Sequence, residues 1–299
     1  MGLMTGSGPC GAQPAGRFNF DRPDRDGLLY LEPSPKRVRV EVGGETIADS
    51  TSVMLLHETG HQPIYYFPPQ GVRTDLLEPS DRRSRCPIKG QASYHTIRVG
   101  EHVVENGAWY YPDPLESAPP IKGLIAFYFN RMDRWLEEDE EITGHPRDPY
   151  HRIDVRRSVR QIRISLAGEL LAQTRRARAL FETGLPTRWY LPLEDVTAEL
   201  EPSDTTTLCP YKGDASYYTV RPSTAGVVGD AAASAKAGED LAWYYPDPLP
   251  DALPVKDLVC FLNEKVDIEL DAAPQERPQS PWSDGSKPAQ NAPPAQTRG

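Results

Sequence analysis

One eleven-residue phrase occurs twice in the chain, as CPIKGQASYHT from Cys86 and as CPYKGDASYYT from Cys209, 123 residues later. Eight of the eleven positions are identical. Other phrases return in the same order: ETG at 58–60 and 182–184, LEPSD at 77–81 and 200–204, and AWYYPDPL at 108–115 and 242–249. This spacing is far longer than the 20–50 residues of a solenoid repeat. The sequence therefore predicts two tandem domains of one fold.

The domain boundaries follow from the extent of the repeat and from changes in composition. The segment between the copies is charged and broken by Pro146 and Pro149, which is typical of a linker. The N-terminal end is rich in glycine and proline, and the C-terminal end is rich in polar residues and proline. The prediction is a disordered tail over 1–34, a first domain over 35–143, a linker over 144–156, a second domain over 157–271 and a disordered tail over 272–299. An enlarged surface loop is expected at 222–240.

Within each copy the local pattern is that of short strands. RVRVEV at 37–42 alternates apolar and charged residues, as a strand with one wet face does. ASYHTIRV at 92–99 and GAWYYP at 107–112 are rich in β-branched and aromatic residues. LIAFYF at 124–129 fits either a buried strand or a helix. We expect a mainly β protein of two antiparallel domains, with little helix beyond one turn near 115–122.

Composition excludes several classes of function. A net charge of −10 disfavours nucleic acid and anionic membranes as partners, because both need a basic surface. No apolar run reaches the roughly 18 residues of a membrane span, and the N-terminus has neither the basic start nor the apolar core of a signal peptide. Four cysteines without a disulfide-like spacing indicate reduced thiols. These features predict a cytoplasmic protein.

The phrases ETG, LEPSD, CPxKGxASY and AWYYPDPL, in this order and in both copies, resemble the domain of unknown function 427 family. The resemblance extends over Arg37–Glu141 and Gln161–Leu270, and the linker motif at His145–Arg152 is part of it. It implies a β-tent-like fold, in which two sheets lean together, as in methionine-sulfoxide reductase B and the ligand-binding domain of cereblon. It implies no established activity.

The family also carries a nucleotidyltransferase-like label, which the residues do not support. Polymerase-type nucleotidyltransferases need a Gly-Ser turn followed by paired acidic metal ligands, and the one Asp-x-Asp pattern, Asp24–Asp26, lies in the predicted tail. No Walker loop is present, since Lys89-Gly90 has the reverse order. One cysteine at the repeated position of each copy falls short of the four ligands of structural zinc. We expect no metal and no cofactor.

Cys86 and Cys209 are the candidate catalytic residues. Each stands three residues before a lysine, Lys89 or Lys212, and a nearby positive charge favours the reactive thiolate. Two other interpretations stay open at this stage. The cysteine contacts a ligand, or it is a small buried residue that ends a strand before a tight turn, with the lysine in solvent.

AWYYPDPL is the most informative phrase for a ligand site. On a strand, Trp109 and Tyr111 share one face and Tyr110 takes the other, so the rings need either two cores or a groove. Tryptophan and tyrosine offer stacking area and a polar handle. The alternatives are a packed core tryptophan and an Asp-Pro turn cap. The predicted ligand site has seven residues in each domain. They are Tyr66, Lys89, Ser93, Tyr94, Trp109, Tyr111 and Asp113 in the first domain, and Tyr190, Lys212, Ser216, Tyr217, Trp243, Tyr245 and Asp247 in the second.

All six histidines lie at or before His151, so the repeat gives the second copy none. This excludes a histidine-dependent reaction shared by both halves, but leaves open that His57 or His95 activates Cys86 in the first. The leading hypothesis is a protein that binds a small, anionic or aromatic metabolite in one aromatic groove per domain. A thiol-dependent transferase or reductase and a scaffold for a partner peptide are the alternatives; no protein partner can be named.

Overall fold

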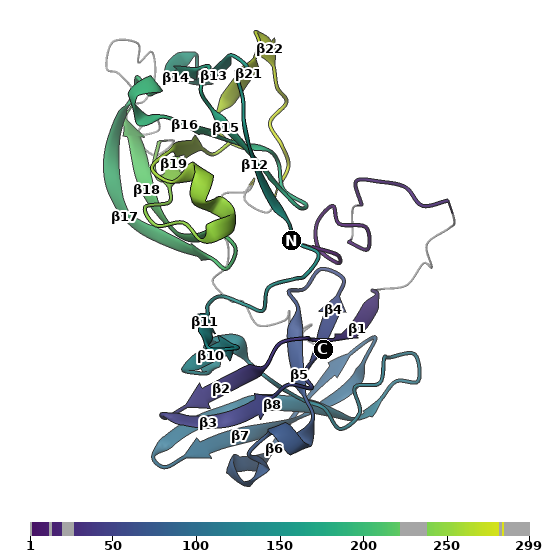
Figure 1. Ribbon diagram of the computed structural model, residues 1–299. Coiled ribbons are helices and arrows are strands. Elements are labelled where there is room, and N and C mark those ends of the chain that lie inside the picture. Colours follow the sequence, from purple (N-terminus) through teal and green to yellow (C-terminus); the bar gives the residue numbers. More distant parts are fainter. Residues whose placement is uncertain (1, 12–13, 20–26, 222–237, 281–282, 284–299) are drawn as a thin grey trace. The chain divides into compact units, whose positions relative to one another are not determined.

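The computed structural model describes all residues except 1, 12–13, 20–26, 222–237, 281–282 and 284–299. The described residues divide into two compact units between Tyr150 and His151, and most of their strands are labelled in Figure 1. Most of the predicted loop insertion at 222–240 and most of the predicted C-terminal tail lie outside the described residues. No helix in the described part of the chain combines the length and the apolarity needed to cross a membrane.

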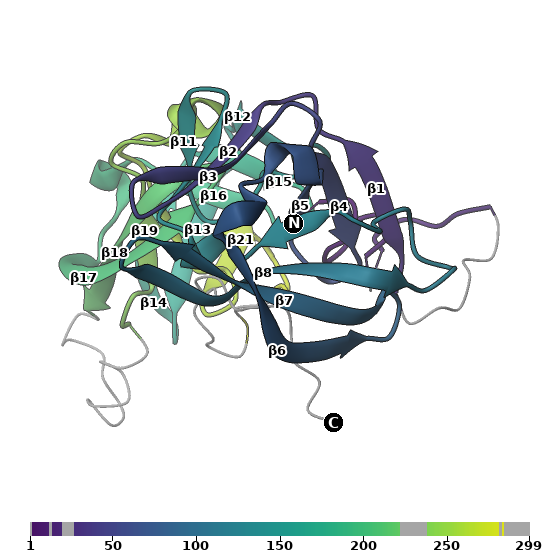
Figure 2. The ribbon, with the colours of Figure 1, turned by 90° about the horizontal axis from the view of Figure 1, so that it is seen from below.

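The first unit contains two antiparallel sheets. The larger sheet has, in spatial order, β1 (Leu29–Pro33), β4 (Met54–Glu58), β5 (Ile64–Phe67), β9 (Ile125–Phe127), β8 (His102–Pro114), β7 (Gly90–Val99) and β6 (Leu77–Cys86). The smaller has β11 (Glu140–Ile142), β10 (Arg134–Glu137), β2 (Val38–Val42) and β3 (Glu45–Ser50). Figure 2 shows β6, β7 and β8 side by side. The short 3₁₀ helices are Pro69–Gly71, Thr74–Leu76 and Phe129–Arg131.

The second unit repeats this topology. Its larger sheet has the order β12 (Ile153–Arg157), β15 (Arg178–Glu182), β16 (Arg188–Leu191), β20 (Val259–Phe261), β19 (Ala242–Tyr244), β18 (Gly213–Arg221) and β17 (Glu199–Cys209). Its smaller sheet has β14 (Glu169–Thr174), β13 (Ile162–Leu166), β21 (Asp267–Leu270) and β22 (Ala273–Pro274). The 3₁₀ helices are Leu193–Asp195 and Pro250–Val255. The predicted fold class, mainly β with two tandem antiparallel domains and little helix, is confirmed.

The larger sheet of each domain is buried on both faces. In the first domain, one face packs against the smaller sheet through a core that includes Val40, Phe67 and Trp135. The opposite face carries a second cluster that includes Trp109 and Tyr111. The second domain repeats both clusters. Because side chains alternate across a strand, β8 gives Ala108 to the first core and Trp109 and Tyr111 to the second. Tyr110 is in neither core; it is half-buried and stacks on His95. The rings of AWYYPDPL therefore do not require a groove.

Several local features differ from expectation. The ambiguous segment LIAFYF contains β9, which hydrogen-bonds to strands on both sides and so lies inside the sheet. The helical turn near 115–122 is a series of turns in the first domain, whereas a 3₁₀ helix occupies the corresponding part of the second. Strands also extend past the predicted boundaries. β1 lies inside the segment assigned to the tail, and β12 begins inside the predicted linker, because pairing with β4 and β15 orders these edges.

Candidate functional site

The repeated CPxKG phrase forms the tight turn between the last two strands of each larger sheet. Cys86 ends β6 and Gly90 begins β7. Gly90 has a φ of +102°, which residues with a side chain rarely adopt. The Lys89 carbonyl accepts a hydrogen bond of 3.0 Å from the Leu115 backbone N–H. Gly213, with a φ of +94°, makes the equivalent turn. The turn directs the lysine onto the sheet face that carries the second cluster.

Both lysines are buried in ion pairs. Lys89, 5% exposed, donates to Glu58 of β4, and Lys212, 8% exposed, donates to Glu182 of β15. The interpretation that the lysine is solvated is therefore wrong, because the turn and the opposing carboxylate hold it inside. Glu58 and Glu182 were missed as site residues. The repeated ETG phrase contained that signal.

Burial and mutual attraction act in opposite directions on the pKa values of Glu182 and Lys212 in the second domain. Burial opposes ionisation of Glu182, but the charge of Lys212 and hydrogen bonds from His151 and Lys212 outweigh it and lower the pKa of Glu182 to about 2. Burial likewise opposes the charge of Lys212, but Glu182 outweighs it and raises the pKa of that lysine. Both groups are therefore ionised at neutral pH.

Tryptophan and tyrosine side chains form the wall beside each pair. The Trp109 indole N–H donates to the Tyr66 hydroxyl at 3.3 Å, and Trp243 donates to Tyr190 at 3.1 Å. In both domains these two rings lie edge to face with centroids 6.4 Å apart. The hydroxyl of Tyr94 contacts that of Ser84 at 2.6 Å, and Tyr217 contacts Thr207 at 2.9 Å.

Tyr111 and Tyr245 complete the buried wall. The ion pair, the aromatic wall and the half-buried cysteine occur in both domains, and we call this set the Glu–Lys site. Its members are Glu58, Tyr66, Cys86, Lys89, Tyr94, Trp109 and Tyr111 in the first domain, and Glu182, Tyr190, Cys209, Lys212, Tyr217, Trp243 and Tyr245 in the second.

Four predicted residues do not join the Glu–Lys site. Ser93 and Ser216 neighbour Tyr94 and Tyr217 on regular strands, so they project from the opposite face of the sheet. The two aspartates are solvent-exposed and pair with exposed lysines, Asp113 with Lys122 at 3.0 Å and Asp247 with Lys256 at 3.6 Å. In the first domain, β8 has one extra residue between its partners of Gln91 and Ser93, and this bulge turns Asp113 outward.

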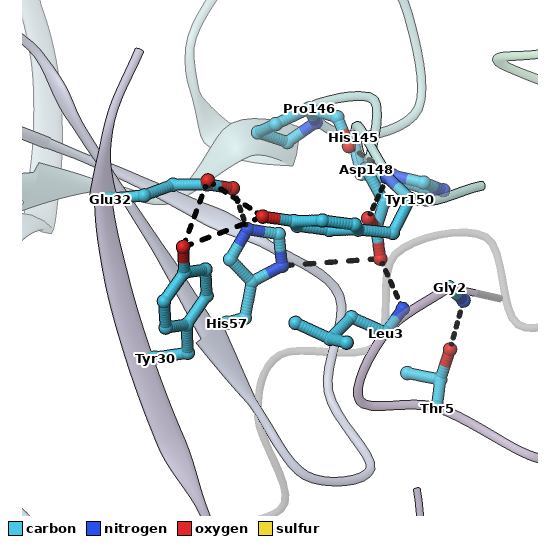
Figure 3. A network of polar contacts seen from close by, with 10 residues as sticks. All are labelled: Gly2, Leu3, Thr5, Tyr30, Glu32, His57, His145, Pro146, Asp148 and Tyr150. Atoms are coloured by element: carbon cyan, nitrogen blue, oxygen red, sulfur yellow. Dashed lines mark hydrogen bonds and ion pairs between the residues drawn. The ribbon is translucent and has the colours of Figure 1, made fainter. Parts of the chain in front are cut away.

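His57 and His95 face away from Cys86. His57 follows Leu56 and precedes Glu58 on β4, so it projects from the other face, where it is 1% exposed. Figure 3 shows it between two carboxylates, with Nε2 2.8 Å from Glu32 and Nδ1 3.9 Å from Asp148. His95 stacks on Tyr110 with ring centroids 4.9 Å apart. The hypothesis that either histidine activates Cys86 is therefore wrong.

A different histidine approaches the buried pair in each domain. His151, assigned to the linker from the sequence, belongs to the second unit; its Nε2 lies 3.1 Å from Glu182, and its ring stacks on Tyr211. In the first domain, His61 Nδ1 lies 4.0 Å from Glu58. These histidines occupy non-equivalent sequence positions. The conclusion that the second copy has no histidine is corrected, because spatial proximity rather than alignment supplies the imidazole.

The cysteines lie at the edge of the site, and both are half-buried. The Cys86 sulfur is 4.0 Å from the Glu58 Oε1 atom. Glu58 is also the ion-pair partner of Lys89, so the lysine charge beside the cysteine is already neutralised. The contacts of Cys86 suit a ligand-contacting or packing role better than that of a nucleophile.

Removing that carboxylate charge gives a direct test. We expect iodoacetamide to alkylate Cys86 roughly threefold to tenfold faster in Glu58→Gln, because Lys89 then acts on the thiol without an opposing charge. Peptide mass mapping measures the rate at each cysteine, and circular dichroism checks the fold. Asp113→Asn, which removes an exposed carboxylate of the same domain, leaves the rate unchanged. A wild-type Cys86 that reacts faster than glutathione would support the thiol-dependent enzyme instead.

The described residues contain no group of three or more His, Cys, Asp or Glu side chains arranged to hold a metal ion. A family model described as Domain of unknown function (DUF427) matches the chain twice, over residues 30–138 and 154–272. Each match lies within one unit and contains one complete Glu–Lys site. No curated protein matches the chain.

Proposed function

The chain belongs to the DUF427 family in both of its halves, and we propose that each domain binds one small, uncharged, planar ligand at its Glu–Lys site. The observation that carries the proposal is the duplicated buried ion pair. Both copies keep the same glutamate, lysine, tryptophan and tyrosines in the same contacts. Their half-buried cysteines stand at the edge of the site.

The energetics of burial argue against a purely structural reason for the pair. Desolvating two charges costs several kcal/mol per ion, and a well-packed apolar pair is often as stable or more so. Elsewhere in the same sheet the copies have diverged freely. Ile64 corresponds to Arg188, and Ala126 corresponds to Cys260. Both copies retain an ion pair whose burial costs free energy, although neighbouring positions have changed. This supports a role for the pair in ligand recognition.

The charge balance of the site indicates the class of ligand. Lys89 and Lys212 are each neutralised by a glutamate, so neither lysine offers the unpaired positive charge on which the expected anionic ligand depended. The ammonium and the phenol hydroxyls donate hydrogen bonds, and the carboxylate accepts them. With the aromatic wall beside them, these groups suit a flat ligand with a donor and an acceptor close together.

Native mass spectrometry of the freshly purified protein, compared with its denatured mass, tests the proposal. We expect a bound species at up to two equivalents, and its loss in the double variant Trp109→Phe/Trp243→Phe, which keeps an aromatic ring but removes the indole donor. The matched control is Tyr110→Phe/Tyr244→Phe, which alters the adjacent residue on the other face of the same strands. A bare wild-type chain, or equal loss in the control, would contradict ligand binding at this site.

A further inference from the structure

A cavity of about 480 Å³ lies within the second domain, between its larger sheet and its smaller sheet. Its apolar wall includes Ala179 of β15, Trp189 of β16, and Ile268 and Leu270 of β21, strands that are labelled in Figure 1. This volume is in the range of sites that hold small organic molecules. No residue of the Glu–Lys site lines the cavity, so it is a separate feature.

Comparison of the two domains explains why this space is open. Ile268 pairs with Ile164 at the register position where the first domain pairs Trp135 with Val40. Trp135 is buried and stacks on Phe129, with ring centroids 5.0 Å apart and planes 8° apart. Isoleucine is much smaller than tryptophan. The second domain therefore leaves open a volume that an indole fills in the first.

An arginine without an ion pair lines the cavity. Arg157 of β12 lies directly opposite Arg178 of β15, and neither makes an ion pair with any residue that the structure describes. Like charges directly opposite each other destabilise a sheet. The first domain has Pro33 opposite Met54 at this position. A bound anion would relieve the repulsion, which exists only in the second domain.

The other charged residues at the cavity are close to balanced. Three arginines that line it are paired with aspartates at 2.8 Å: Arg156 with Asp154, Arg160 with Asp271, and Arg277 with Asp267. Glu276 adds one carboxylate to the lining. The excess positive charge therefore comes from Arg157 and from Arg178, its partner on the neighbouring strand β15.

One residue of the cavity lining also carries a buried hydrogen-bond acceptor that has no partner among the described residues. Asn263 is 8% exposed and lines it; its amide nitrogen donates to the Thr187 carbonyl at 2.9 Å. Its Oδ1 atom is buried and has no hydrogen-bond partner among the described residues. A buried acceptor without a partner has lost the hydrogen bond that water gives it in the unfolded chain. An N–H or O–H group of a ligand would satisfy it.

We propose that this cavity is a binding site for a small amphipathic organic anion that carries an N–H or O–H donor. The apolar body lies against Trp189, Ile268 and Leu270, the anionic group pairs with the Arg157 guanidinium, and the donor reaches Asn263 Oδ1. The proposal stands on residues that the Glu–Lys site does not use. The first domain has no such site, because Trp135 fills the equivalent space.

The probe 8-anilinonaphthalene-1-sulfonate has this chemistry, since it combines two aromatic groups, a sulfonate and an N–H. We expect it to bind the full chain saturably at one equivalent, with increased fluorescence. Arg157→Gln weakens binding roughly tenfold, as loss of a charge-assisted contact does. Ile268→Trp, which gives the second domain the residue found in the first, abolishes binding. Arg163→Gln is the matched control, because Arg163 is an exposed arginine of β13 outside the cavity.

Three results would overturn the proposal: no saturable binding to the wild type, equal affinity in Arg157→Gln and Arg163→Gln, or full binding in Ile268→Trp. Circular dichroism melting identifies an Ile268→Trp variant that fails to fold. In that case the comparison of Arg157→Gln with Arg163→Gln decides the matter, because both changes lie at exposed positions. Neither change touches the Glu–Lys site, so the outcome is independent of the function proposed above.

Discussion

Lys212→Met is expected to lower the free energy of unfolding of the second domain by about 3–5 kcal/mol, because it leaves the buried Glu182 carboxylate without its counter-charge. Urea unfolding of the full chain, followed by tryptophan fluorescence, measures the change. The double variant Lys212→Met/Glu182→Leu removes both charges and is expected to recover most of the lost stability. Lys89→Met and Glu58→Leu provide the same test in the first domain.

The matched control for this prediction is Lys256→Met. Lys256 pairs with Asp247 on the surface, at 3.6 Å, with the two side chains 46% and 95% exposed. Such a pair contributes about 0–1 kcal/mol, so the control is expected to change stability little. A double variant that is as unstable as Lys212→Met alone would contradict the interpretation, since it would mean that packing of the lysine stem, not the unpaired charge, accounts for the loss.

The second large effect is a loss of stability in acid. The folded pKa of Glu182, about 2, lies below the value of 4.5 for an unperturbed glutamate. Its ionisation therefore stabilises the folded state by about 3 kcal/mol at pH values above 4.5. This contribution is lost as the pH falls from about 5 toward 2, where the folded carboxyl also takes up its proton. Urea unfolding at pH 7, 5, 4 and 3 measures the decline.

The variant Glu182→Gln isolates this contribution. It cannot ionise, so we expect its stability to fall less between pH 5 and pH 3 than that of the wild type. Asp247→Asn is the control, because the Asp247 side chain is 95% exposed and its removal leaves the acid transition in place. A Glu182→Gln variant with the same decline as the wild type would show that other groups cause the acid sensitivity.

The sequence was sufficient to predict the duplicated domain and its strands. Repetition of CPxKGxASY and AWYYPDPL in the same order identifies two copies of one fold whatever that fold is. Alternation in RVRVEV and the richness of ASYHTIRV in β-branched and aromatic residues predicted β2 and β7. Both signals are local, because the β propensity of a segment and the alternation of its two faces depend only on consecutive residues.

The candidate site was predicted in part. Lys89, Trp109, Tyr111, Tyr94 and their counterparts do lie in one cluster per domain, and they come from neighbouring strands and from the turn that joins them. Ser93 and Asp113 were placed there wrongly. Strand alternation would have separated Ser93 from Tyr94, whereas the bulge that turns Asp113 outward depends on how β7 and β8 pair.

By itself the sequence determined that this protein is two tandem antiparallel β domains with one lysine-bearing turn and one aromatic strand in each. Tertiary structure alone decided that each lysine is buried against a glutamate about thirty residues away in the chain, and that His151 belongs to the second domain. It also decided that one domain has a cavity where the other has an indole. Strand periodicity is a property of neighbouring residues, whereas partners and empty space arise only when strands distant in sequence pack together.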